Sequence, residues 1–133
     1  MYHKIIIVGN LGRDPEMRYS PSGQAVTNFS LASNRTYKGN DGQQVKETIW
    51  FRISVWGNQA EACNQYLTKG SKVLVEGRLN PDSDNGSPRV FQRKDGSWGS
   101  SYEVTAQTVR FLTSRGESDE VGETPSDNDE IPF

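Results

Sequence analysis

The feature that most restricts the fold of this chain is an alternation of residue types over residues 47–56. Aliphatic and aromatic residues occupy one parity of this segment, namely Ile49, Phe51, Ile53 and Val55. Polar residues and two tryptophans occupy the other parity. Successive side chains of a β-strand point to opposite faces, so a period of two over this length predicts a strand with one aliphatic face. The fold must bury the aliphatic face, and the two tryptophans on the opposite face need a separate explanation.

Strand-like patterns also occur in residues 4–8, 25–33, 72–79, 89–93 and 97–112. The turn residues Lys94, Asp95 and Gly96 join the last two segments into a hairpin. Loops are predicted over residues 38–42 and 80–88, where glycine, asparagine, aspartate and proline concentrate.

One helix is predicted after residues 47–56. Asn58 can cap its N-terminus, and Glu61 three residues later completes a capping box. Three apolar residues fall on one face: Ala60, Cys63 and Leu67. Gly70 offers a left-handed stop. The predicted order is three strands, a short helix, and two more strands with an extended hairpin between them. A five-stranded Greek-key barrel of the OB type has this order. We therefore expect a mainly all-β fold with its helix between strands three and four.

Charge divides the chain into two unlike parts. Residues 1–113 hold fourteen basic and ten acidic residues, a net charge of +4, whereas residues 114–133 hold one basic and seven acidic residues, a net charge of −6. Low hydrophobicity with charge of one sign predicts disorder. We therefore expect a folded domain over residues 1–113, a disordered acidic linker over 114–126 and an acidic tip over 127–133. The tip carries large apolar side chains, Ile131 and Phe133, that a purely solubilising tail would not need.

Metal chemistry and nucleophilic catalysis have little support in the sequence. One cysteine, Cys63, and one histidine, His3, cannot build a zinc site or a catalytic triad of the usual kind. We expect a protein that is not an enzyme and uses no cofactor or metal. No apolar run approaches the roughly 20 residues that span a bilayer, and the N-terminus lacks the features of a signal peptide. The simplest expectation is a cytoplasmic protein with no membrane partner.

Two tryptophans and an arginine share the face of residues 47–56 that points away from the core: Trp50, Arg52 and Trp56. A subunit interface or a second core layer would explain one such tryptophan. Two of them beside an arginine favour base stacking, because every nucleobase has a π-face and each stack contributes roughly 1–3 kcal/mol without reading sequence.

Further aromatic residues are expected in loops, each among basic residues. Arg35 and Lys38 bracket Tyr37. Around the predicted hairpin, Arg89, Arg93 and Lys94 accompany Phe91 and Trp98. This interleaving predicts a basic groove with stacking sites for a single nucleic-acid strand. The alternative is an OB-type adaptor whose aromatic face binds protein or structured RNA, while a small hydrolase rests only on the available serines and carboxylates.

Several short motifs occur in a specific order along the chain. They are IVGNLGRDPE at 7–16, RY at 18–19, FSLA at 29–32, WFR at 50–52, YLTKGS at 66–71, VEG at 75–77 and DEIPF at 129–133. In this order and spacing the chain resembles the bacterial single-stranded DNA-binding protein family over nearly its whole length.

The resemblance implies an OB fold that assembles as a homotetramer and is wrapped by single-stranded DNA during replication, recombination and repair on the nucleoid. It assigns stacking to Trp50, Trp56, Tyr37 and Phe91. It implies phosphate contacts at Arg18, Arg52, Lys69 and Arg89. It also implies that the tip docks on replication and repair proteins through Asp127, Asp129, Glu130, Ile131, Pro132 and Phe133.

Overall fold

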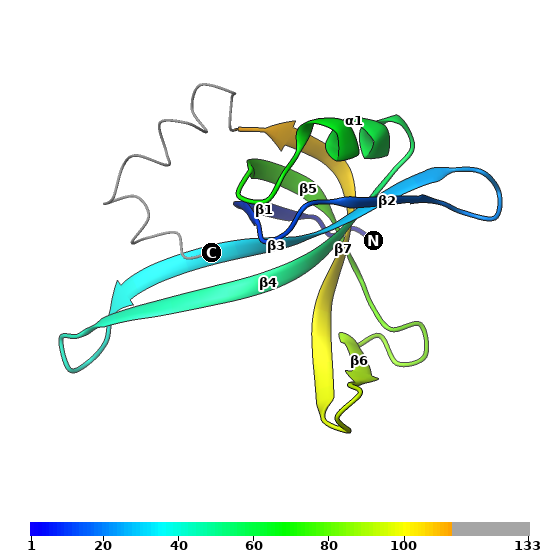
Figure 1. Cartoon of the computed structure of the whole chain (residues 1–133). Coiled ribbons are helices and arrows are strands. Elements are labelled where there is room, and N and C mark those ends of the chain that lie inside the picture. The colour runs from blue at the N-terminus through cyan, green and yellow to red at the C-terminus, as the bar shows by residue number, and fades with distance from the viewer. Residues whose placement is uncertain (113–133) are drawn as a thin grey trace.

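The computed structural model describes residues 1–112 of the chain. In it, five strands form a closed barrel around the apolar side chains (Figure 1). The elements are β1 (Ile5–Leu11), β2 (Glu16–Tyr19), β3 (Ala25–Lys38), β4 (Gln44–Trp56), α1 (Asn58–Tyr66), β5 (Lys72–Asn80), β6 (Arg89–Gln92) and β7 (Trp98–Phe111). The strand order is β1-β5-β7-β4-β3, and a second pairing of β1 with β3 closes the barrel. The predicted OB-type barrel, with one helix between its third and fourth strands, is confirmed. The predicted acidic linker and tip lie outside the described residues.

The core receives side chains from all five barrel strands. Its fully buried aliphatic members are Leu11, Leu31, Ile53, Val55, Val73, Val75 and Val104. The predicted parity of β4 is confirmed where this strand crosses the barrel, because Ile53 and Val55 are buried while Trp50 and Trp56 are 48% and 42% exposed. Ile49 has the parity of the core but is exposed, since β4 has left the barrel at that point. Burying one such aliphatic side chain contributes roughly 1.5–3 kcal/mol.

Barrel closure depends on a change of partner along β1. Residues 5–10 of β1 pair with β5, whereas Asn10 and Leu11 pair with β3. Gly9 lies at this crossing, and a Cβ there would overlap the carbonyl oxygen of Ala32. Glycine at this position therefore lets the two strands approach closely enough for the barrel to close.

The predicted capping box of α1 is wrong. The residue at the N-cap is Gly57, with φ of 76°, and no side chain caps the helix. The N–H of Gly57 donates to the carbonyl oxygen of Ala25 over 3.0 Å, which ties the helix start to β3 and places Asn58 inside the first turn. The helix ends at Tyr66, before the predicted stop at Gly70.

The apolar face of α1 is as predicted. Ala60 and Cys63 are buried in the helix, and Leu67 is buried directly after it. Cys63 and Leu67 belong to the barrel core. The buried Thr27 hydroxyl donates to the carbonyl oxygen of Ala60 over 2.6 Å and fixes the helix against β3. None of the helices in residues 1–112 is long and apolar enough to cross a membrane.

Two of the hairpins that project from the barrel carry most of the predicted DNA-binding residues (Figure 1). We call residues 33–49 the arm, where β3 and β4 remain paired up to Lys38 and Gln44. The second is the β6–β7 hairpin, in which β6 pairs with the start of β7. The description of Tyr37, Phe91 and Trp98 as loop residues is wrong. Tyr37 lies on β3, which continues past its predicted end at residue 33, whereas Phe91 and Trp98 lie on β6 and β7, as the strand patterns over residues 89–93 and 97–112 predicted. The short strand β2, paired with β3, was not predicted.

Candidate nucleic-acid interface

The outer side of the barrel presents one face that continues across several strands. On β4, Trp50, Arg52 and Trp56 share this face, opposite the parity of the buried residues. Arg52 lies in register with Glu103 of β7 through the parallel pairing of these strands. Neighbouring residues in register point to the same side of a sheet, so the face continues onto β7. We call this surface the outer face.

The β6–β7 hairpin extends the outer face. Arg89 of β6 lies opposite Ser101, and Phe91 lies opposite Gly99. Positions 99, 101 and 103 share one parity of β7, so Arg89 and Phe91 lie on the same side as Glu103. A cavity of about 580 Å³ is formed where the hairpin meets the barrel. Four predicted contact residues line it: Trp50, Arg52, Arg89 and Phe91.

The Trp50 ring lies against the backbone of Gly12 in the connection that follows β1. A Cβ on residue 12 would lie 2.6 Å from Cζ3 and 2.8 Å from Cη2 of Trp50. Ordinary contacts between carbon atoms are about 3.5–4.0 Å long, so only glycine allows this position of the ring. Gly12 is itself fixed, because its N–H donates to the carbonyl oxygen of Ser30 over 3.0 Å. The ring therefore rests on backbone that is tied to β3.

Two of the predicted stacking rings already carry an arginine. The guanidinium carbon of Arg35 lies 4.6 Å from the ring centroid of Tyr37, and that of Arg93 lies 5.5 Å from the centroid of Phe91. Arg93 also donates from its guanidinium to the carbonyl oxygen of Trp98 over 2.7 Å, which holds it against the hairpin. A base can stack on the ring face opposite the arginine, and the cation strengthens the electrostatic attraction at the same place.

Two of the predicted phosphate-binding cations form ion pairs, one on the arm and one between β6 and β7. Arg35 lies 3.3 Å from a carboxylate oxygen of Glu47, and Arg89 lies 3.7 Å from Oε2 of Glu103. Both arginines are well exposed. An exposed pair such as Arg35–Glu47 contributes about 0–1 kcal/mol, so a phosphate can replace the Glu47 carboxylate at little cost.

The end of the β6–β7 hairpin carries a fixed negative charge. The carboxylate of Asp95 accepts hydrogen bonds from the hydroxyl of Ser97 over 2.6 Å and from its backbone N–H over 2.9 Å. These bonds lower the pKa of Asp95, the hydroxyl having the larger effect. The predicted cation Lys94 therefore sits beside an ionised carboxylate in the turn.

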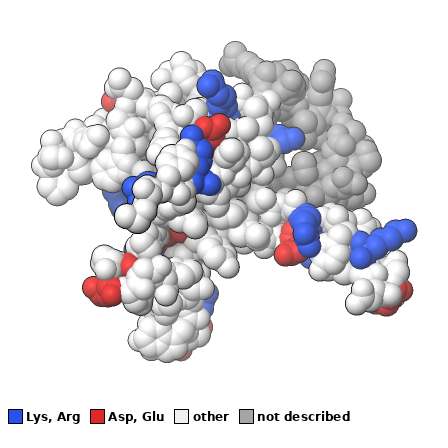
Figure 2. Space-filling view, turned by 180° about the vertical axis from the view of Figure 1, so that it is seen from behind, with Lys and Arg blue, Asp and Glu red and all other residues white. Residues whose placement is uncertain are grey.

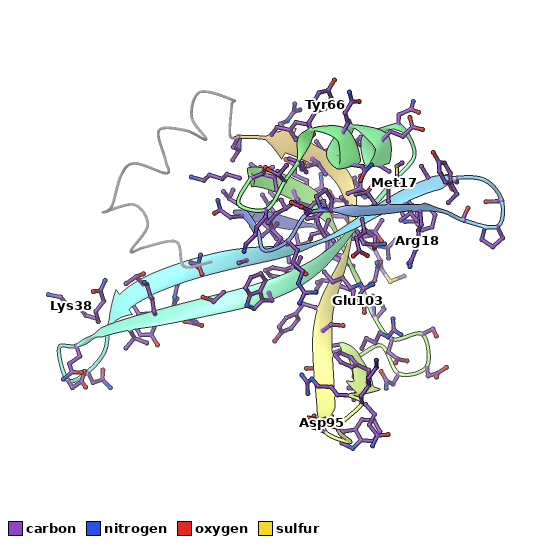
Figure 3. All side chains as sticks on the ribbon, viewed as in Figure 1. Met17, Arg18, Lys38, Tyr66, Asp95 and Glu103 are labelled. Atoms are coloured by element: carbon purple, nitrogen blue, oxygen red, sulfur yellow. The ribbon has the colours of Figure 1, made fainter. Side chains whose placement is uncertain are left out.

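The other predicted DNA-binding residues do not line the cavity, and Figure 3 labels two of them, Arg18 and Lys38. Lys38 is at the end of the arm, with Tyr37 and Arg35 on the same strand. Arg93, Lys94 and Trp98 lie at the end of the β6–β7 hairpin, where Figure 3 labels Asp95. Trp56 and Arg18 flank Val26 on β4 and β2, and Lys69 lies in the connection between α1 and β5. The structure thus divides the predicted DNA-binding residues into a central cavity, three outlying groups and Lys69.

Sequence reasoning did not select four charged residues that line the cavity: Arg13, Asp14, Glu16 and Glu103. Arg13 directly follows Gly12, the glycine against which the Trp50 ring lies. Its position next to this glycine is the feature that could have pointed to it. Glu103 is negatively charged, whereas a site for a polyanion is expected to contain positive charges. Its register with Arg52 places it on the outer face. Acidic residues are thus part of the surface.

The net positive charge of the body is divided into separate groups on the side seen in Figure 2. On the side seen in Figure 2, the described Lys and Arg side chains form small groups, several of them next to Asp or Glu. Most of the visible surface between these groups belongs to other residues. On this side, the described cations therefore form separate groups and not one broad basic surface.

Comparisons with known proteins place the chain among similar sequences. The profile of the Single-strand binding protein family matches residues 2–112. Proteins named single-stranded DNA-binding protein from Helicobacter hepaticus and Neisseria meningitidis are 44% and 40% identical over 90% and 87% of this chain. The matched regions are 66% and 63% of those proteins, so the chain spans about two thirds of the length of these relatives.

A solved structure resembles the fold as well. The crystal structure of a deletion mutant of the single-stranded DNA-binding protein from Thermus aquaticus superimposes with a TM-score of 0.63 at 32% sequence identity. The match covers 85% of this chain and 51% of that chain.

Proposed function

The chain belongs to the single-strand binding protein family, and on this premise we propose that it binds single-stranded DNA on the outer face with little dependence on sequence. The cavity between β4 and the β6–β7 hairpin is the observation that best supports this function. It combines two stacking rings, Trp50 and Phe91, with two cations, Arg52 and Arg89. Rings bind bases of any sequence, and cations neutralise the phosphates between them.

The outlying groups extend the proposed path of the strand in three directions. Tyr37, with Arg35 and Lys38, would receive the strand along the arm. Trp98, with Arg93 and Lys94, would receive it along the hairpin. At the other end of β4, Trp56 and Arg18 lie on the same face, with the buried Val26 between them in register. Lys69 would contribute a phosphate contact from the connection after α1.

Titration with an oligothymidine tests this proposal. Binding should quench tryptophan fluorescence, and Trp50→Ala and Phe91→Ala should each weaken binding by roughly 1–3 kcal/mol, the contribution of one stacked base. Tyr66→Ala is the matched control, because Tyr66 is an aromatic residue 65% exposed on α1, away from the outer face. Unchanged fluorescence at low salt would exclude the function. Equal affinity of Trp50→Ala, Phe91→Ala and the parent at moderate salt would exclude the assigned stacking sites.

The same titration distinguishes the adaptor alternative. A protein that uses the outer face for protein or structured RNA should prefer duplex or RNA competitors, whereas the proposed function requires single-stranded DNA to compete best. Measuring the mass in solution with and without oligothymidine tests the proposed homotetramer, for which the family resemblance is the support. Trp50 or Trp56 buried against another subunit would favour the interface explanation of these residues.

We propose in addition that the acidic segment recruits replication and repair proteins. Residues 127–133 combine three acids with Ile131, Pro132 and Phe133, which suits a partner with an apolar pocket and a basic rim. Residues 114–126 would link this tip to a DNA-binding domain over residues 1–113 in the cytoplasm. Deletion of residues 127–133 should leave DNA binding equal or slightly stronger, because the acids compete with phosphates for the same cations. Weaker DNA binding by the truncated chain would contradict this role.

A further inference from the structure

The connection between β1 and β2 borders the cavity and carries charges of both signs. Arg13 and Asp14 of this connection line the cavity, and Gly12 directly before them lies against the Trp50 ring. Asp14 is exposed. A carboxylate at this place repels the phosphates of a polyanion, so its presence calls for a role other than direct contact with the ligand.

Asp14 reaches across to the connection between α1 and β5. A carboxylate oxygen of Asp14 accepts a hydrogen bond from the backbone N–H of Lys69 over 2.8 Å. The next two residues are held by backbone bonds instead. The N–H of Gly70 donates to the carbonyl oxygen of Leu11 over 2.8 Å, and the N–H of Leu11 donates to the carbonyl oxygen of Ser71 over 2.9 Å. Loss of the Asp14 carboxylate would therefore release the Lys69 backbone, while the neighbouring bonds to the end of β1 remain.

Lys69 is a cation that a phosphate can reach without displacing an acid. It is exposed, and within residues 1–112 its ammonium forms no ion pair, unlike the guanidinium groups of Arg35 and Arg89. Its backbone N–H contacts Asp14, which lines the cavity. Lys69 is therefore next to the edge of the cavity, although it does not line it.

The other acids that line the cavity are placed differently. Glu16 is exposed on β2, and its carboxylate accepts no hydrogen bond within the described part of the chain. Glu103 accepts a hydrogen bond from the hydroxyl of Ser101, two residues away on the same strand, and pairs with Arg89. Among these three acids, Asp14 is the one whose side chain accepts a backbone N–H from a distant segment.

We propose that Asp14 is a positioning residue, which holds the Lys69 backbone so that the ammonium meets a phosphate of the strand bound in the cavity. This inference rests on the proposed function and deepens it, because it assigns a role to an acid in a polyanion site. Lysine has a flexible four-carbon side chain, and a fixed backbone lowers the entropy lost when its charged end binds. Asp14 thus has two opposing effects: its charge repels phosphates, whereas its hydrogen bond supports a cation that attracts them.

Two substitutions at position 14 separate these effects. Asp14→Asn and Asp14→Ala remove the same negative charge, but the amide oxygen of asparagine can still accept the Lys69 N–H and alanine cannot. The ratio of their affinities for oligothymidine therefore reports the hydrogen bond and not the charge. Asp14→Asn should bind about two- to fivefold more tightly than Asp14→Ala at low salt, the lower part of the range for one hydrogen bond because Asp14 is exposed. The slope of log affinity against log salt concentration should be smaller for Asp14→Ala by up to about 0.7, since a released Lys69 contacts phosphate less often.

A Lys69→Gln background shows whether Asp14 acts through the Lys69 ammonium. In this background Asp14→Asn and Asp14→Ala should bind equally, because the charge that the hydrogen bond positions is gone. The matched control is the pair Glu16→Gln and Glu16→Ala, which makes the same chemical comparison at an acid of the cavity that accepts no hydrogen bond. These two variants should bind equally to each other. Urea unfolding checks that all variants are folded.

The outcomes separate this inference from the proposed function. If the parent does not bind oligothymidine, the proposed function fails and the inference fails with it. If the parent binds and the two variants at position 14 bind equally, the positioning role is overturned while the function stands. The same conclusion follows if the advantage of Asp14→Asn persists in the Lys69→Gln background, because the hydrogen bond then supports the connection and not the cation.

Discussion

Substituting alanine for Gly12 should weaken DNA binding through Trp50 without touching a ligand-binding side chain. The added Cβ would lie 2.6 Å from Cζ3 of Trp50, about 1 Å closer than an ordinary carbon contact. The backbone of Gly12 is outside the left-handed region, so alanine is tolerated there. Trp50 is about half exposed and can move outward, which leaves the core intact. We therefore expect the free energy of unfolding to change by less than about 1 kcal/mol.

The loss of affinity follows from the displacement of the ring. A gap of 0.5–1 Å removes about a quarter to a half of a contact energy, and a base stack contributes roughly 1–3 kcal/mol. Gly12→Ala should therefore cost about 0.3–1.5 kcal/mol of binding free energy, a weakening of up to about tenfold. Titration with oligothymidine measures the change, and urea unfolding checks that the variant is as stable as the parent.

A double mutant makes this prediction refutable. If Gly12→Ala acts through the ring, adding it to Trp50→Ala should have no further effect, because the side chain that it displaces is already gone. Equal weakening of the parent and of Trp50→Ala would show that the glycine acts by another route. Parental affinity of the single variant would show that the position of the ring is unimportant.

Three further predictions concern the core, the buried thiol and the cations. Leu31→Ala, at a fully buried position, should lower the free energy of unfolding by about 2–5 kcal/mol in urea, whereas Ile49→Ala on the arm should change it by less than about 1 kcal/mol. Burial raises the pKa of the Cys63 thiol from 9.0 to about 11. The folded state therefore holds this proton more tightly than the unfolded state, so the free energy of unfolding should fall as the pH rises from about 9 to about 11. The fall should be roughly 1.4 kcal/mol per unit of pKa difference, and Cys63→Ala should not show it. Arg52→Gln should reduce the slope of log affinity against log salt concentration by about 0.7. The control is Lys4→Gln, which removes the ion pair of Lys4 with Glu76 away from the outer face and should leave the slope unchanged. Equal slopes for Arg52→Gln and the parent would show that Arg52 makes no phosphate contact.

Local patterns in the sequence were enough to predict the barrel. The alternation in β4 separates Ile53 and Val55 from Trp50 and Trp56 because the two faces of a strand depend only on residue parity. The order of strands and helix then left few alternatives to the OB topology. Where the patterns failed, a distant partner decided the outcome. The start of α1 is fixed by the bond from Gly57 to Ala25 of β3, and β2 exists through its pairing with β3.

The candidate site was predicted as a set of residue types and not as an arrangement. Sequence alone selected rings and cations, because their chemistry is carried by each side chain separately. It could not select Glu103, whose charge argues against the site until its neighbours are known. It also could not separate Trp50 and Phe91, which share the cavity, from Trp98 and Tyr37, which do not line it.

The sequence by itself thus determined the five barrel strands, the faces of β4 and the kinds of side chain available for binding. Only the tertiary structure decided which of them meet. The parallel pairing of β4 with β7 sets Arg52 beside Glu103, and the hairpin then brings Arg89 and Phe91 to the same cavity. The physical reason is that strand periodicity is set by neighbouring residues, whereas register between distant strands is set by how the whole core packs.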